Sequence, residues 1–131
     1  MKSIEVVGAA IMKDGRLFIA RRPDKGEVAL KWEFPGGKIE AGETPQQALV
    51  REIEEELETE IAVDRLIATV RHQYSSFHLT MHVFLCHLKG RDPVLEEHVD
   101  SRWIERGQLY DFDWAPADIK ILPEIEKACF G

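Results

Sequence analysis

The sequence lacks the features that mark several classes of protein. Two cysteines, Cys86 and Cys129, are too few and too far apart for a disulfide scaffold or a cysteine metal clip. No apolar run approaches the length of a membrane span. Lys and Arg number 17 against 24 Asp and Glu, and the net charge of −7 disfavours nonspecific binding to nucleic acid polymers or anionic membranes. The chain is therefore not expected to bind a nucleic acid polymer or a membrane.

What is present is the composition of an ordinary globular domain. The hydrophobic fraction is 44% and the charged fraction 31%, and 131 residues are enough for one domain, residues 1–131, with a proper core. The N-terminal stretch MKSIEVVGAAIMKDG is interrupted by Glu5, so a strand is favoured over a signal peptide. We expect a cytoplasmic protein with reduced thiols.

Patterns along the chain predict strands and helices without a regular alternation. IEVVGAAIM and LFIARR flank the turn signal KDGR and predict a hairpin. WEF predicts a short strand, residues 61–74 and 77–88 a long hairpin, and residues 102–104 another short strand. The tail from Ala115 to Phe130 predicts a helix distorted at Pro123. This mixture predicts an α+β sandwich, with a mixed sheet between helices.

The best-signalled helix spans about residues 45–58. Thr44 can cap its start, Pro45 suits the first helical position, and Gln47 completes a capping box. The buried stripe consists of residues four apart: Leu49, Ile53 and Leu57.

This helix carries an unusual concentration of acid. REIEEELE places five carboxylates in eight positions, although like charges at i,i+4 repel. Glu52, Glu55 and Glu56 share the face opposite the apolar stripe, where a hard divalent cation would relieve the repulsion. A solvated acidic face is the alternative. The upstream Gly36-Gly37-Lys38 favours the metal site, because it predicts a flexible turn with bare carbonyls and a cation for phosphate.

The stretch GGKIEAGETPQQALVREIEEELETE resembles the Nudix box. The matching positions are Gly37, Glu43, Arg51, Glu52, Ile53, Glu55 and Glu56. WEFPGGKIEAGETP is similar to the MutT branch, and APAD is similar to its bacterial CTP pyrophosphohydrolase relatives. The resemblance implies a Nudix-type α/β/α sandwich.

Two positions depart from the Nudix pattern. Glu58 stands where the family usually has glycine, and Thr59 where it has an apolar residue. That glycine normally ends the helix in a left-handed conformation. Because Glu tolerates this conformation poorly, we expect the helix to run on slightly or to end by another turn. Altered geometry rather than an inactive site is the expected consequence.

The resemblance implies hydrolysis of a nucleoside triphosphate to the monophosphate and pyrophosphate, with Mg²⁺ as cofactor or Mn²⁺ in its place. The implied metal ligands are Glu52, Glu55, Glu56, Glu97 and a carbonyl of Gly36 or Gly37. Glu43 and Arg51 would form a structural pair. The base for the attacking water is open between Glu52 and Glu97, with Glu96 competing for the role of Glu97 and a solvated loop as the plain alternative.

Other residues are candidates for substrate binding, each with a structural alternative. Arg22 and Lys38 suit phosphate, although Arg22 fits a surface ion pair equally well. Asp118 suits the exocyclic amino group of cytosine, or a helix start. Three aromatic residues could stack on a base or belong to the core: Phe34, Tyr74 and Phe77.

Three rival functions stay open at this point. A Nudix hydrolase of another nucleoside diphosphate derivative would have the same box. A catalytically weak nucleotide-sensing domain would be expected to lose part of the Arg-Glu and Glu-Glu set, which is intact here. A structural calcium site would leave Lys38 unexplained. The sequence does not choose between a monomer and a homodimer.

Overall fold

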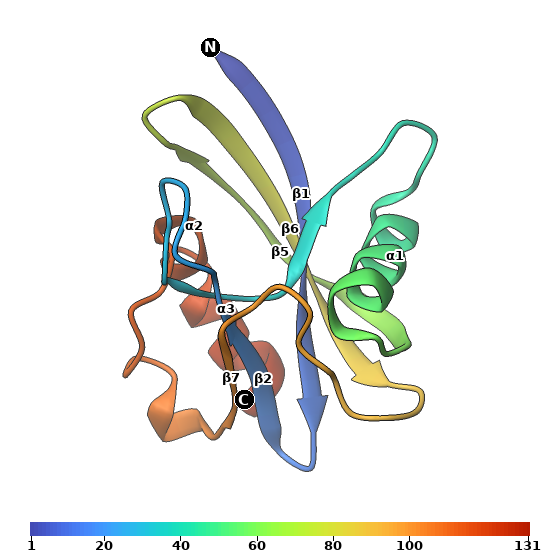
Figure 1. Cartoon of the computed structure of the whole chain (residues 1–131). Helices are drawn as coiled ribbons and strands as arrows, with labels where there is room; N and C mark the ends of the chain where they lie inside the picture. Colours follow the sequence, from blue (N-terminus) through green and yellow to red (C-terminus); the bar gives the residue numbers. More distant parts are fainter.

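The computed structural model describes residues 1–131 and contains a seven-stranded sheet with helices on both faces (Figure 1). The strands are β1 (Lys2–Lys13), β2 (Arg16–Arg21), β3 (Trp32–Glu33), β4 (Gly36–Lys38), β5 (Ile61–Gln73), β6 (Phe77–Leu88) and β7 (Asp100–Ile104). The α-helices are α1 (Pro45–Leu57), α2 (Pro116–Ile119) and α3 (Leu122–Ile125), with a 3-10 turn at Arg106–Gln108 and a π-helical turn at Glu126–Phe130. None of the helices is long and apolar enough to cross a membrane.

The sheet is mixed, as the sequence predicted. Its main path runs β3-β2-β1-β6-β5, with β4 paired to β1 and β7 paired to β2. The long strand β1 runs parallel to β6 and antiparallel to β2 and β4. Both predicted hairpins are confirmed: Asp14 and Gly15 turn β1 into β2 with positive φ angles, and β5 pairs antiparallel with β6. The α+β architecture with a mixed sheet is confirmed.

Alternating side chains divide the core between the two faces of the sheet. Val7, Ala9 and Ile11 of β1 pack with the apolar stripe of α1 on one face. Ala10 of β1, together with Leu17 and Ile19 of β2, packs with α2 and α3 on the other face. Because successive strand residues point to opposite faces, β1 and β2 serve both layers.

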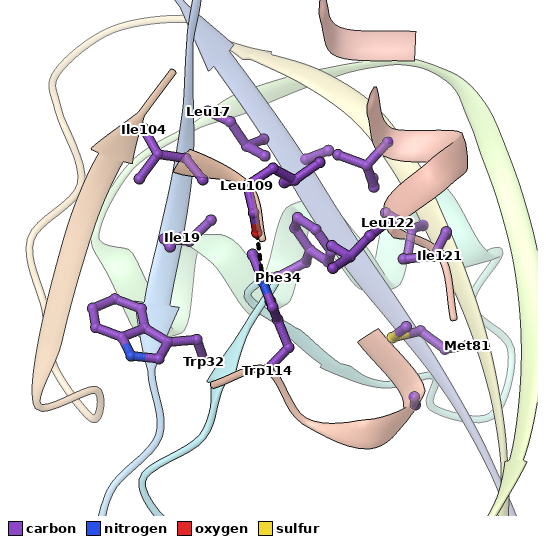
Figure 2. Close-up of a cluster of buried hydrophobic side chains, with 14 of the residues drawn as sticks. Leu17, Ile19, Trp32, Phe34, Met81, Ile104, Leu109, Trp114, Ile121 and Leu122 are labelled. Atoms are coloured by element: carbon purple, nitrogen blue, oxygen red, sulfur yellow. Dashed lines mark hydrogen bonds between the residues drawn. The ribbon is translucent and has the colours of Figure 1, made fainter. Parts of the chain in front are cut away.

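The second layer contains both buried tryptophans, Trp32 and Trp114, together with Phe34 (Figure 2). Phe34 stacks on Trp114 with ring centroids 4.9 Å apart, and the indole N–H of Trp114 donates to the carbonyl of Leu109 at 2.8 Å. The backbone adds to this contact, because Trp32 exchanges hydrogen bonds with Asp113 and Ala115. These bonds join β3 to the segment that precedes α2.

Helix α1 begins where the sequence predicted, but its C-terminal end differs from the prediction. Thr44 and Gln47 form the reciprocal capping box. The helix stops at Leu57, and Glu58 itself adopts the left-handed conformation at φ 50 and ψ 38, with its N–H donating to Glu54. The expectation that Glu58 would avoid this conformation is wrong. The carbonyl of Glu58 accepts from Arg91 Nε at 2.6 Å, a contact that holds the strained residue from outside the helix.

The tail is helical but is not one helix. α2 ends at Ile119, and α3 begins at Leu122 with Pro123 in its first turn. Proline has no N–H and fits the start of a helix, so it begins a new helix here instead of distorting a long one.

Candidate active site

The diglycine lies in a strand, not in the flexible turn that the sequence predicted. Gly36 and Gly37 belong to β4, which pairs with β1, and neither has a positive φ angle. Space is the reason for glycine here. A Cβ on Gly36 would lie 1.9 Å from the carbonyl oxygen of Val7, and one on Gly37 would lie 2.4 Å from the carboxylate of Glu52. The two glycines allow α1 and β1 to approach β4 closely.

Arg51 joins the loop before α1 to the helix itself. Its Nε and NH2 donate to the two oxygens of Glu43 at 2.6 and 2.9 Å, and NH2 also donates to the carbonyl of Lys38 at 3.0 Å. The guanidinium lowers the pKa of Glu43 to about 2, with further help from the backbone N–H of Glu40. This fork-to-fork geometry is that of a structural clamp, as predicted for the pair.

The three glutamates of α1 that were expected to share one face do not all point to one place, which corrects the expected convergence. Glu52 and Glu56 lie close together, whereas Glu55 is exposed and 3.4 Å from Arg51 NH1. The helical period explains the split, because Glu52 and Glu56 are about 40° apart around the axis and Glu55 lies about 100° from Glu56. Arg51 NH1 also bonds Glu52 Oε1 at 2.8 Å.

Glu56 has the most perturbed environment of these carboxylates. Its Oε2 is buried and makes no hydrogen bond. Burial, followed by the charges of Glu52 and Glu33 and then of Glu97, raises the pKa of Glu56 to about 9. Such a group is characteristic of a site that receives a cation or a proton.

A cleft of about 360 Å³ opens beside Glu56, between β4, α2 and the β5–β6 hairpin. Part of its lining, called the polar end below, consists of charged side chains: Glu33, Glu56 and Glu97, with Arg22 and Lys38. The rest, called the base end, is mainly apolar, and its side chains are Ile4, Val6, Val28, Phe34, Tyr74, Phe77, Leu79 and Met81. Asp118 also lines the cleft, next to Phe34 and near enough to Glu33 to be affected by its charge. A phosphate chain suits the charged part, and a flat aromatic base suits the apolar part.

The structure separates the two loop glutamates that competed at the sequence level. Glu97 lines the cleft, whereas Glu96 is exposed outside it and donates its N–H to the carbonyl of Glu56 at 3.1 Å. The geometry thus favours Glu97 over Glu96, and the catalytic role of Glu97 stays a prediction.

Both predicted phosphate contacts face the cleft. Lys38 is exposed on β4. Arg22 is half-buried and bonds Glu33 Oε1 through NH1 at 3.0 Å, while its Nε is buried without a partner. Arg22 therefore makes an ion pair and also lines the cleft, so the two interpretations of this residue are compatible.

The base-end candidates are largely core residues with one edge toward the cleft. Phe34 and Tyr74 are buried, and Phe77 is half-buried against Tyr74 at 5.1 Å. Asp118 does not cap its own helix: its Oδ1 accepts from the N–H of Phe34 at 3.0 Å. Burial, followed by the charge of Glu33, raises the pKa of Asp118 well above its usual value.

Two polar residues of this region were missed at the sequence level. Glu33, in the strand predicted from WEF, accepts from Arg22 and from His98 Nε2, the latter at 2.9 Å. His98 is buried directly after Glu97. An acidic residue between Trp32 and Phe34 was the available signal for Glu33. His98 had none, because its partner lies 65 positions away.

The donor set fits a divalent cation bound through oxygen. Three or more His, Cys, Asp or Glu side chains do not converge closely enough anywhere in the structure to hold an ion by themselves. The buried, unpartnered oxygen of Glu56 and the neighbouring Glu52 nevertheless supply hard, negatively charged ligands. Mg²⁺ binds proteins through one or two carboxylates of this kind and completes its shell with water and substrate phosphates.

A larger hollow, of about 720 Å³, lies along the outer side of α1 beside Val50 and Val63. It contains Arg51 and Glu55 but no other box residue and no aromatic side chain. The smaller cleft is the better candidate, because it combines the buried oxygen of Glu56, the cationic Lys38 and Arg22, and an apolar lining.

Comparison with known proteins agrees with this geometry. The NUDIX domain family profile matches residues 6–124, and the chain belongs to this family. It is 38% identical to the CTP pyrophosphohydrolase of Escherichia coli (strain K12) over 124 residues, covering 93% of this chain and 90% of that protein.

MutT-type proteins are also similar to this chain. The 8-oxo-dGTP diphosphatase of Escherichia coli (strain K12) is 31% identical over 128 residues, covering 97% and 99% of the two chains. The solution structure described as DNA mismatch repair protein MutT from methicillin-resistant Staphylococcus aureus 252 superposes with a TM-score of 0.79 at 38% identity, covering 98% and 99%. The resemblance to the MutT branch is confirmed, and the chain is a Nudix-class enzyme.

Proposed function

We propose that this Nudix enzyme hydrolyses a nucleoside triphosphate to the monophosphate and pyrophosphate, with Mg²⁺ or Mn²⁺ as the metal ion. The observation that carries the proposal is the cleft, which combines the half-buried Glu56, whose Oε2 is buried and unpartnered, with an apolar lining beside the buried Asp118. The names of the CTP and 8-oxo-dGTP relatives support a nucleoside triphosphate as substrate. A cytoplasmic location and the choice between monomer and homodimer stay predictions.

The residues divide the work along the cleft. Lys38 and Arg22 attract and orient the phosphate chain. The ion pair of Arg51 with Glu43 fixes the position of the loop relative to α1. Glu52 and Glu56, with Glu97, would hold the metal ion, which when bound neutralises charge on the phosphate oxygens. Glu97 or Glu52 accepts a proton from the attacking water. Water adds its oxygen to one phosphorus, and the oxygen bridging the α and β phosphates leaves with the other.

The base end would select the nucleobase. Asp118 presents a carboxyl group beside Phe34, and such a group can accept from the exocyclic amino group of cytosine. CTP, dCTP or a modified nucleotide with the same edge is therefore the favoured substrate class.

The test is a screen of the eight common ribo- and deoxyribonucleoside triphosphates, plus modified cytosine and guanine forms, with Mg²⁺ and pyrophosphate as the measured product. We expect Glu52→Gln to lower kcat by ~10²-fold or more, because it removes a metal ligand or a base. Activity of that variant near the wild-type rate would contradict the assignment. A flat, inactive profile for the wild type would overturn the proposed function.

Asp118→Asn tests the base end separately. It keeps an oxygen for the N–H of Phe34 but adds a donor, so the preference in kcat/KM among bases should shift by about 10-fold. Asp113→Asn, at an exposed aspartate paired with Lys31, is the matched control and should leave the preference unchanged. An unchanged preference in Asp118→Asn would remove Asp118 from base recognition.

A further inference from the structure

Three polar side chains at the polar end of the cleft form a chain of hydrogen bonds. Glu33 Oε1 accepts from Arg22 NH1 at 3.0 Å, and Glu33 Oε2 accepts from His98 Nε2 at 2.9 Å. The His98 side chain is 4% exposed and that of Glu33 is 16% exposed. Because an ionised carboxylate can only accept, the ring nitrogen donates, and each Glu33 oxygen has its own donor.

The loop that carries His98 is tied to the rest of the molecule on either side of it. Val94 and Glu96 donate their N–H groups to the carbonyls of Leu57 and Glu56, at the last turn of α1, at 2.7 and 3.1 Å. Carbonyls at a helix end lack partners within the helix, so the loop completes them. Val99 donates to the carbonyl of Arg21 on β2 at 3.0 Å.

Glu97 and His98 span the gap between these two attachments. Neither residue makes a hydrogen bond through its own backbone to another backbone group. The bond from His98 to Glu33 is the one side-chain hydrogen bond that holds this dipeptide. Glu97, its neighbour, faces the cleft and lies near enough to Glu56 to raise the pKa of that carboxyl.

We propose that His98 is a positioning residue, which holds Glu97 toward the catalytic carboxylates by donating to Glu33. The proposal rests on the proposed function, in which Glu97 takes part in the chemistry. Arg22 contributes to this positioning, because it also donates to Glu33 and so holds in place the carboxylate to which His98 donates.

Packing alone does not account for histidine at this position. His98 Nδ1 is buried and has no hydrogen-bond partner. An unpaired buried polar atom costs free energy that an apolar side chain of similar size would not. The hydrogen bond from His98 Nε2 to Glu33 requires a side chain that can donate, and an apolar side chain could not make it.

The test is a double-mutant cycle with Glu97. We expect His98→Leu to lower kcat by about 10-fold or more, with KM for the nucleotide changed less than about threefold, because a catalytic group is misplaced while the binding surface remains. His98→Gln, whose amide can donate in place of Nε2, should restore most of kcat. In a Glu97→Gln background His98→Leu should cause almost no further loss. Equal losses in both backgrounds, or no loss in His98→Leu, would overturn the proposal.

Hydrogen exchange followed by mass spectrometry supplies a measurement that needs no turnover. The peptide containing residues 94–99 should exchange faster in His98→Leu and at the wild-type rate in His98→Gln. Unchanged exchange in His98→Leu would overturn the positioning role. If the wild type hydrolyses no triphosphate, the proposed function fails, while this measurement still decides whether His98 holds the loop.

A second histidine–carboxylate pair offers the control. His87 Nδ1 lies 2.9 Å from Asp64 Oδ2 on the exposed side of the β5–β6 hairpin. His87→Leu should leave kcat, KM and the exchange of residues 94–99 at wild-type values. Thermal unfolding of each variant shows whether it is folded at the assay temperature.

Discussion

At the scale of single residues, the electrostatic cost of the site is concentrated on Glu56. Leu57 and Ile53 bury one side of α1, and the turn of the helix then places Glu56 at the edge of that buried surface, beside Glu52 and facing Glu33 and Glu97. An ionised carboxylate so placed lacks both water and a hydrogen-bond donor at Oε2. The cation that we propose for this site would relieve this cost, which otherwise lowers the stability of the metal-free protein.

Glu56→Gln should therefore stabilise the metal-free protein at alkaline pH. The folded pKa of about 9 lies above the ordinary 4.5, so the folded state holds the proton more tightly than the unfolded chain. The free energy of unfolding of the wild type then falls as pH rises from about 4.5 toward 9, and the glutamine variant lacks this loss. Tm measured in EDTA from pH 5 to pH 9 should show the variant's advantage growing with pH.

Glu54→Gln, on the exposed face of α1, is the control and should follow the wild-type pH profile. A Tm difference between Glu56→Gln and wild type that is constant with pH would contradict the assignment of the raised pKa to Glu56. Activity of Glu56→Gln should be low at every pH, because the variant lacks the carboxylate that we propose as a metal ligand.

At the scale of elements, the C-terminal end of α1 contacts the loop that contains Arg91. The helix stops at Leu57 because Glu58 turns into the left-handed region, a conformation that costs a residue with a side chain roughly 1–2 kcal/mol. Arg91 compensates from outside, through the carbonyl of Glu58 and through a 3.6 Å contact with its exposed carboxylate. A glycine, which the family usually has at this position, would adopt the same left-handed conformation without the steric cost.

Glu58→Gly should raise the free energy of unfolding by about 1 kcal/mol, as measured by urea denaturation. The backbone bond from Arg91 survives this change, and the exposed ion pair that is lost contributes little. Glu54→Gly, inside the same helix, should lower stability by about 1 kcal/mol. A destabilised Glu58→Gly would mean that the Arg91 contact outweighs the backbone strain.

At the scale of the whole molecule, the two core layers support different ends of the cleft. The layer under α1 carries the glutamates and the Arg51 clamp. The layer under α2 and α3 carries the proposed base end, because Trp114 packs against Phe34 (Figure 2) and the N–H of Phe34 donates to Asp118. Disruption of the second layer should therefore affect stability and nucleotide binding together.

Trp114→Ala should destabilise the protein by about 3–5 kcal/mol, because it removes a buried indole, its stack on Phe34 and its bond to Leu109. Urea denaturation followed by circular dichroism measures the loss. Tyr110→Ala, at a side chain 60% exposed, should change stability by no more than about 0.5 kcal/mol. A loss below about 1 kcal/mol for Trp114→Ala would show that the second layer is not a cooperative part of the core.

The local signals were predictable because they depend on neighbours in the chain. The capping box of Thr44 and Gln47 and the stripe of α1 follow from spacing within a few residues, and the spacing of the Nudix box identified the family. The conformation of Glu58 was predicted wrongly, because its stabilising partner Arg91 lies 33 positions away.

The sequence by itself determined the class of fold, the family, and the set of charged groups on one helix. Only the tertiary structure decided which of them meet: Glu55 turns toward Arg51 and solvent, Glu56 has one oxygen buried, and Glu33 joins Arg22 to His98. The physical reason is the range of the interactions. Periodicity and capping act along a few residues of chain, whereas burial and ion pairing depend on which strands and loops the mixed sheet brings side by side.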